Sequence, residues 1–139
     1  MIKEFTADTW PKDRFINFSF AEIACRETGQ CLIDLSFMDK VQRLRSGCGF
    51  GLTVTSGYRS PSHSVEAAKE ARGTHTYGVA IDIAVSGAKA HTVLSEALSL
   101  GFTGIGVCQK GPLESRFLHL DCMIPYISTR FPRPSVWSY

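Results

Sequence analysis

The chain has 139 residues, of which 44% are hydrophobic and 20% charged, so we expect one domain, 1–139, with an ordinary core. Its formal net charge of +2 is too small to indicate a nucleic-acid partner, although it would not repel an anionic polymer. Because the sequence has no run of about 18 apolar residues and Met1–Asp8 lacks a signal-peptide pattern, we expect neither a membrane partner nor export, and the chain is expected to be cytoplasmic as synthesised.

The first predicted elements are two helices. Ser19 is a cap-type serine followed three residues later by Glu22, which is the capping-box pattern of a short helix over 19–25. Asp34 can cap a longer helix that ends at Gly47 and carries core contacts. Its apolar residues recur at helical spacing: Phe37, Met38, Val41 and Leu44.

The middle of the chain alternates strand-like and uncertain segments. The β-branched run 52–56 predicts a strand that delivers Tyr58 and Arg59 to its end. Segment 63–73 is rich in alanine, glutamate and lysine and fits a short helix or an ordered loop equally well. The apolar run 80–85 predicts a central strand.

A helix and two strands are predicted next. The helix follows Ser86, ends at Gly101, and has one apolar face. Segments 104–108 and 116–121 flank a turn and predict an antiparallel pair, and the proline-containing tail is expected to wrap the domain as irregular chain anchored by Trp137. The elements predict an α+β fold with helices on one side of a mainly antiparallel sheet. The helix face comprises Ala90, Val93, Leu94, Ala97 and Leu98.

The cysteines are five in number, and none forms a Cys-x-x-Cys pair. This fits neither a disulfide framework nor a cysteine-rich structural zinc site. We predict reduced, mostly buried thiols that pack as small hydrophobic groups, and the alternative is that one is a nucleophile. The five are Cys25, Cys31, Cys48, Cys108 and Cys122.

Two histidines and one aspartate form a candidate metal site. His75 and Asp82 lie on either side of Gly78, and His119 lies in the predicted strand 116–121. Imidazole and carboxylate are good zinc donors, and three protein ligands with a fourth position left to water are what a catalytic zinc site requires. A lone histidine is more often a surface or core residue, and Asp82 could instead pair with Arg59. The combination favours a zinc hydrolase.

Three motifs in a fixed order carry a family resemblance. They are Ser-Gly-Tyr-Arg-Ser-Pro at 56–61, Gly-Thr-His-Thr-Tyr-Gly-Val-Ala-Ile-Asp at 73–82 and Phe-Leu-His-Leu-Asp at 117–121. From Phe18 to the C-terminal tyrosine the chain resembles the zinc D-Ala-D-Ala carboxypeptidases and related peptidoglycan peptidases, and in particular their small, phage endolysin-like branch. The resemblance implies a hedgehog- and DD-peptidase-like α+β fold and one Zn²⁺.

The resemblance also implies roles for individual residues. His75, Asp82 and His119 match the zinc ligands, and Arg59 matches the arginine that holds a substrate carboxylate; a structural salt bridge is its alternative role. Many relatives carry a small hydroxyl residue where this chain has Gly73, so Thr74 is expected to supply that hydroxyl at the substrate.

The general base is not assigned by the resemblance. Several relatives carry a glutamate three residues before the last histidine or a histidine two before it, where this chain has Arg116 and Phe117. Asp121 is the first choice because residues two apart on a strand share a face, and Glu114 is the second. Asp121 could instead orient His119 by accepting its other ring proton.

The remaining histidines and tyrosines have weaker signals. His63 follows the turn after Arg59 and could line the cleft as a transition-state donor, whereas His91 is expected to be an exposed helix residue. Tyr58 and Tyr77 could form a wall for the substrate or pack in the core.

The sequence thus predicts a monomeric zinc metallopeptidase that hydrolyses an amide bond in the peptidoglycan stem peptide, as a D-Ala-D-Ala carboxypeptidase or an endopeptidase. A phage lysis enzyme that reaches the cell wall after release is the expected biological setting. One alternative is a zinc-retaining binding module of the cell wall or virion without turnover. Another is a metal-free structural protein of a virion.

Overall fold

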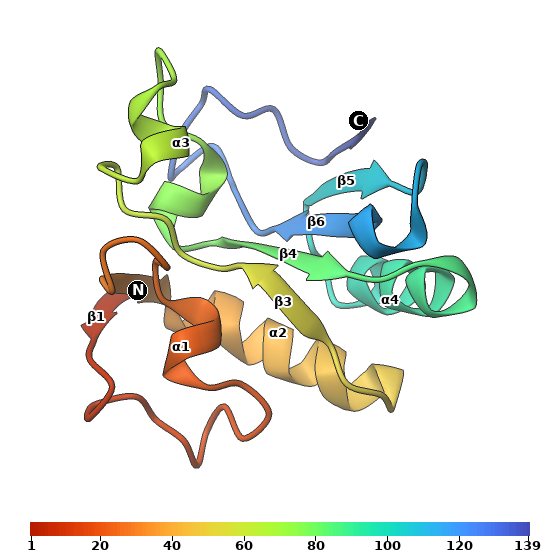
Figure 1. Ribbon diagram of the computed structural model, residues 1–139, viewed down its shortest axis with the longest axis horizontal. Coiled ribbons are helices and arrows are strands. Elements are labelled where there is room, and N and C mark those ends of the chain that lie inside the picture. Colours follow the sequence, from red (N-terminus) through yellow and green to blue (C-terminus); the bar gives the residue numbers. More distant parts are fainter.

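The computed structural model describes residues 1–139 and is built around a five-stranded sheet (Figure 1). Neighbouring strands in this sheet pair antiparallel, except β5 and β7, which run parallel to each other. The predicted α+β class with a mainly antiparallel sheet is confirmed. In spatial order the strands are β3 (Thr53–Ser56), β4 (Ala80–Ala84), β6 (Phe117–Asp121), β5 (Gly104–Cys108) and β7 (Ser135–Ser138).

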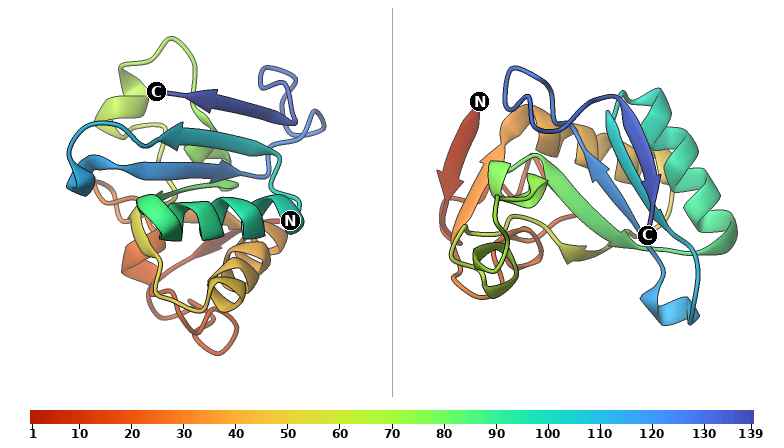
Figure 2. Two further views of the ribbon diagram at one scale, coloured as in Figure 1. Left: turned by 90° about the vertical axis from the view of Figure 1, so that its right-hand side faces the viewer. Right: turned by 90° about the horizontal axis from the view of Figure 1, so that it is seen from above.

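Two long helices cover one face of the sheet. Figures 1 and 2 show α2 (Leu35–Cys48) and α4 (Gly87–Ser99) packed together on one side. The short α3 (Ser64–Ala67) and the 3₁₀ turn η1 (Thr74–Tyr77) lie on the other side. Segment 63–73 is therefore one helical turn followed by a loop. The sheet thus separates the helix-packed core from the face that carries η1.

The buried residues of the two long helices agree with the prediction, apart from the end of α2 and one residue of α4. All four predicted apolar residues of α2 are buried, but the helix runs through Gly47 and ends at Gly49, which adopts a left-handed φ of 72°. The helix continues through Gly47 because an interior glycine costs a helix only about 1 kcal/mol relative to alanine. On α4, the predicted core residue Leu98 is 62% exposed and lines a surface pocket together with Val136 of β7.

The N-terminal region contains a small second sheet that the sequence pattern did not indicate. β1 (Ile2–Phe5) pairs antiparallel with β2 (Cys31–Asp34), and both strands have only four residues. Between them lies α1 (Phe20–Ile23), whose predicted capping box between Ser19 and Glu22 is present. Strands this short and polar on one side give little periodic signal in a sequence.

The tail is irregular over residues 122–134, as predicted, but its last residues form β7 beside β5, which the prediction missed. Pairing with β7 satisfies the backbone groups of β5 that an edge strand would leave open. Trp137 does anchor this segment, with its ring 5.3 Å from the ring of His119. The tail is therefore part of the sheet face opposite α2 and α4.

The cysteines form no disulfide. Cys25 and Cys31 are buried, but the other three are partly exposed, so the prediction of mostly buried thiols holds for two of the five. Burial raises the pKa of Cys31 to about 12 and that of Cys122 to about 11. No helix of the structure is long and apolar enough to cross a membrane.

Candidate metal centre

Three different elements bring the predicted metal ligands together. His75 lies on η1, Asp82 on β4 and His119 on β6, where Asp82 and His119 are register partners. η1 ends at Gly78, which has a φ of 69°, and a Cβ there would collide with the carbonyl oxygen of Leu32. Only glycine fits this turn. The turn at Gly78 allows His75 to face β4 (Ala80–Ala84), which begins two residues after that glycine.

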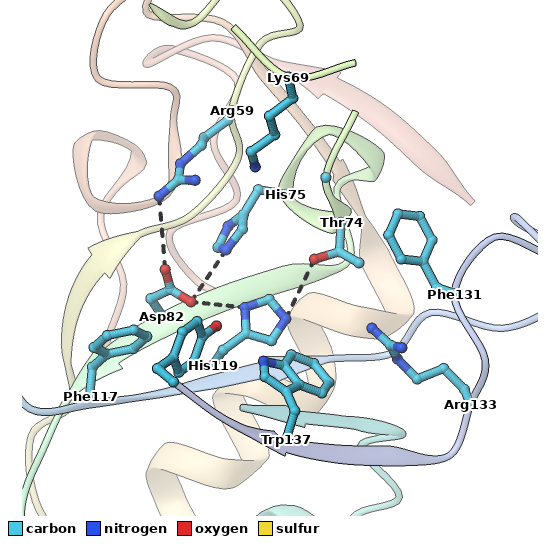
Figure 3. A pocket seen from close by; sticks show the side chains of 12 residues that line it. Arg59, Lys69, Thr74, His75, Asp82, Phe117, His119, Phe131, Arg133 and Trp137 are labelled. Atoms are coloured by element: carbon cyan, nitrogen blue, oxygen red, sulfur yellow. Dashed lines mark hydrogen bonds and ion pairs between the residues drawn. The ribbon is translucent and has the colours of Figure 1, made fainter. Parts of the chain in front are cut away.

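The ligand atoms of the three residues all lie within 4.8 Å of one another. Oδ1 of Asp82 is 3.3 Å from Nε2 of His75 and 2.9 Å from Nδ1 of His119. Figure 3 shows both imidazole rings pointing at this carboxylate from two sides. Two imidazoles and one carboxylate converging on one point are a donor set of the kind that binds catalytic zinc.

Each histidine is held from behind by an acceptor. Nδ1 of His75 donates to the carbonyl oxygen of Gly57 at 2.7 Å, since a carbonyl can only accept. Nε2 of His119 lies 2.8 Å from Oδ2 of Asp121. Such partners keep a proton on the nitrogen that faces away from Asp82, so the opposite nitrogen of each ring is free to present a lone pair to a cation bound beside Asp82. The structure therefore fits a divalent cation at this point.

The electrostatics of the site favour positive charge. Burial opposes the ionisation of Asp82, but hydrogen bonds with His119 and His75 outweigh it and hold the pKa of this carboxyl well below its ordinary range. Burial likewise disfavours the imidazolium form of His119, yet hydrogen bonds to Asp121 and Asp82 raise the pKa of His119 overall. The shift at Asp82 comes from its two histidine partners and the shift at His119 from its two carboxylate partners, so the buried carboxylate is stabilised by positive charge beside it, which a cation also supplies.

The three residues open into a cavity of about 480 Å³, the site cavity. Figure 3 shows Arg59 and Lys69 on one side of the cavity and Arg133 on another, between the rings of Phe131 and Trp137. Asp82 is the single carboxylate in the lining. The other lining residues are Arg59, Lys69, Gly73, Thr74, His75, Phe117, His119, Phe131, Arg133, Trp137 and Tyr139.

The sequence model of the Peptidase M15 family matches residues 16–121, which is most of the chain and includes all three converging residues. The chain belongs to the Peptidase M15 family. Members of this family are zinc-dependent, in agreement with the His-Asp-His cluster. No curated protein shows significant similarity to the chain.

The two residues predicted as candidates for the general base differ in burial: Asp121 is buried and Glu114 is exposed. Asp121 is fully buried behind His119, and both of its oxygens are occupied by hydrogen bonds. Burial opposes its ionisation, but hydrogen bonds with His119 and Arg133 lower the pKa of Asp121 to about 2. Of its two predicted roles, this geometry supports the orienting one. Glu114 is exposed on η2 (Leu113–Ser115) and does not line the site cavity.

Arg59 stands at the cavity with two acidic partners. Its guanidinium lies 3.9 Å from Oδ2 of Asp82 and 3.5 Å from Oε1 of Glu66. Asp82 thus faces the histidines with one oxygen and Arg59 with the other, so the predicted alternative contact with Arg59 is present beside the histidine cluster. Glu66 is buried and also accepts from the Lys69 ammonium and the Gly73 amide. Nothing in the sequence distinguished Glu66 from its alanine-rich surroundings.

The other predicted residues divide into those at the cavity and those outside it. Thr74 lines the cavity, with its hydroxyl 3.4 Å from Nε2 of His119. Tyr58 is buried away from the lining, and His63 caps α3 by accepting from the Val65 amide. His91 is exposed on α4, as predicted.

The tail supplies lining residues that the sequence reasoning missed. Phe131, Arg133 and Tyr139 were not proposed for the site, and Trp137 was expected only as an anchor. All four lie beyond residue 121, where the family match ends. Their place in the site depends on the pairing of β7 with β5, which no local pattern announces.

Proposed function

We propose that this zinc peptidase of the M15 family hydrolyses an amide bond in the stem peptide of peptidoglycan, as a D-Ala-D-Ala carboxypeptidase or an endopeptidase. The observation that supports this proposal is the position of Arg59 in the wall of the site cavity, next to the His-Asp-His cluster. A guanidinium at that place can hold a carboxylate of the substrate while the neighbouring amide reaches the cluster.

The residues have separate tasks in the proposed reaction. His75, Asp82 and His119 would hold Zn²⁺, which when bound activates water and polarises a carbonyl group. Arg59, with Lys69 near it, would bind the acidic end of the peptide and fix its direction across the cavity. Asp121 keeps His119 in one orientation and has no free oxygen for a proton from water. Glu114 would have to reach the cavity from η2 to serve as the base.

The oligomeric state and the biological role of the enzyme are part of the same proposal. A monomeric lysis enzyme of the phage type, which is made in the cytoplasm and acts on the cell wall after release, is suggested by the resemblance of the three motifs. The rest of the chemistry does not depend on this setting.

A second function is favoured by one observation. Asp82 is the single carboxylate in the lining of the site cavity, and its oxygen faces the two histidines, so no acidic side chain is placed to take a proton from water. A zinc-retaining module that binds cell-wall peptide without cleaving it would need no such base.

Mass spectrometry of muropeptides separates these functions. Wild-type protein with zinc is expected to shorten the stem peptide, and a chelator or the substitution His119→Ala should abolish the change. His91→Ala is the matched control, because His91 is exposed on α4 and should leave turnover intact. Intact peptides that nevertheless bind to the zinc-loaded protein would establish the binding module instead.

A further inference from the structure

We propose that Arg133, from the C-terminal segment, is a positioning residue that holds His119 in place through Asp121. The guanidinium of Arg133 donates from Nε to Oδ1 of Asp121 at 2.9 Å and from Nη2 to Oδ2 at 2.7 Å. The same Oδ2 lies 2.8 Å from Nε2 of His119. One carboxylate therefore joins the C-terminal segment to the ring that faces Asp82.

This arrangement is rigid because every partner is buried and doubly held. The side chain of Asp121 is fully buried and that of Arg133 is 7% exposed. Oδ1 of Asp121 also accepts from the Met123 amide at 3.1 Å. A two-pronged contact between a guanidinium and a carboxylate fixes the plane of the carboxylate, whereas a single ammonium could not.

Two glycines of β5 leave the space that this arrangement needs. Gly104 is the register partner of Asp121, and a Cβ at 104 would collide with the Asp121 carboxylate. Gly106 is the register partner of His119, and a Cβ at 106 would lie 2.7 Å from Nε1 of Trp137. β5 thus lacks a side chain at the two positions where the Asp121 carboxylate and the Trp137 indole lie.

The aromatic rings of the tail hold Arg133 from its other side. Its guanidinium carbon is 5.0 Å from the ring centre of Trp137 and 5.8 Å from that of Phe131. Trp137 also packs against His119, with ring centres 5.3 Å apart. Figure 3 shows Trp137 and Arg133 side by side next to the His119 ring. The C-terminal segment therefore brings the indole of Trp137 to His119 and the guanidinium of Arg133 to the Asp121 carboxylate behind it.

The consequence is a fixed tautomer of His119. An ionised Asp121 only accepts, so Nε2 of His119 carries a proton, and Nδ1, 2.9 Å from Oδ1 of Asp82, is the nitrogen that can give up its proton and present a lone pair to a metal ion. Arg133 secures this arrangement by keeping the Asp121 carboxylate in line with Nε2. This inference rests on the zinc role proposed for His119 but not on any particular substrate.

Zinc affinity is the test, measured by competition with a chelating dye on the purified full chain. Arg133→Gln should weaken zinc binding by about 10- to 100-fold, the usual range for groups behind a metal ligand. Arg133→Lys should recover part of this loss. Arg130→Gln is the matched control and should stay within about twofold, since Arg130 packs on Phe131 from the exposed surface and makes no contact with Asp121.

A second readout does not depend on the metal. Long-range ¹H–¹⁵N spectra should show a slowly exchanging proton on Nε2 of His119 in the wild type and its loss or faster exchange in Arg133→Gln. Wild-type zinc affinity in folded Arg133→Gln, or equal losses in Arg133→Gln and Arg130→Gln, would overturn the proposal. If Arg133→Gln does not fold, wild-type affinity in Arg133→Lys would overturn it equally. Failure to cleave muropeptides would reject the proposed substrate and leave these measurements intact.

Discussion

Asp82 and His119 are register partners on the adjacent antiparallel strands β4 and β6, and Nδ1 of His119 lies 2.9 Å from Oδ1 of Asp82. Strand pairing alone therefore sets the distance between two of the three converging side chains. His75 reaches the same oxygen from a separate turn, at 3.3 Å. The site is thus a rigid pair completed by one residue whose place depends on a glycine turn.

Zinc removal should lower the stability of the folded protein. Zinc at about 100 times its dissociation constant stabilises a folded chain by about 2.7 kcal/mol, or about 8 °C in Tm at roughly 3 °C per kcal/mol for this size. Differential scanning fluorimetry with and without a chelator measures the shift. His75→Ala and Asp82→Ala should show almost no shift, whereas His91→Ala should keep it. An equal shift in His75→Ala would contradict the metal site.

Substitution of Arg59 should weaken substrate capture more than turnover. Arg59→Ala removes the guanidinium that we expect to bind a substrate carboxylate, and a charge-assisted hydrogen bond contributes about 1.5–3 kcal/mol. KM for a stem-peptide substrate should therefore rise about 10- to 100-fold with a smaller change in kcat. Arg59→Lys should recover only part of the loss, because an ammonium does not match both carboxylate oxygens. Unchanged KM in Arg59→Ala would leave Arg59 with its salt bridges alone.

Replacement of Gly78 should cost more than replacement of another left-handed glycine. Gly78→Ala forces a side chain into a φ of 69° and against the carbonyl of Leu32, whereas Gly87, with a φ of 62°, has open space around its missing Cβ. We expect Gly87→Ala to destabilise by about 1 kcal/mol and Gly78→Ala by about 3 kcal/mol or more. Urea unfolding measures both values. Equal losses of unfolding free energy in the two variants would show that the turn at Gly78 can shift away from Leu32 on β2.

Thiol reactivity should follow burial and pH. Because burial raises the pKa of Cys31 to about 12 and that of Cys122 to about 11, almost none of either group is thiolate at neutral pH. Iodoacetamide at about pH 8 should therefore leave both unmodified in the folded protein, and the labelling rate should increase as the pH rises toward these values. Peptide mapping after alkylation identifies the modified residues, and urea-unfolded protein is the control. Rapid labelling of Cys31 in the folded protein would contradict its burial.

Local signals in the sequence predicted a good part of this structure. The capping box at Ser19 and Glu22 marked α1, and the spacing from Phe37 to Leu44 marked the buried face of α2. The glycine turn between His75 and Asp82 predicted that these two residues meet, and the structure brings them together with His119. In each case the information lies within a few residues, because caps, periodicity and turns are properties of short segments.

Contacts between distant segments were decided only by the tertiary structure. Gly47 read as a helix stop but lies inside α2, and the last residues of the tail, which read as irregular, form β7. Asp121 acquires its orienting position from Arg133, twelve residues further along the chain, and from the space left by Gly104 on another strand. The sequence by itself determined which side chains could bind a metal and where the chain turns. Which buried charge pairs with which distant cation follows from close packing, because a desolvated carboxylate is stable only beside the donors that the finished fold brings to it.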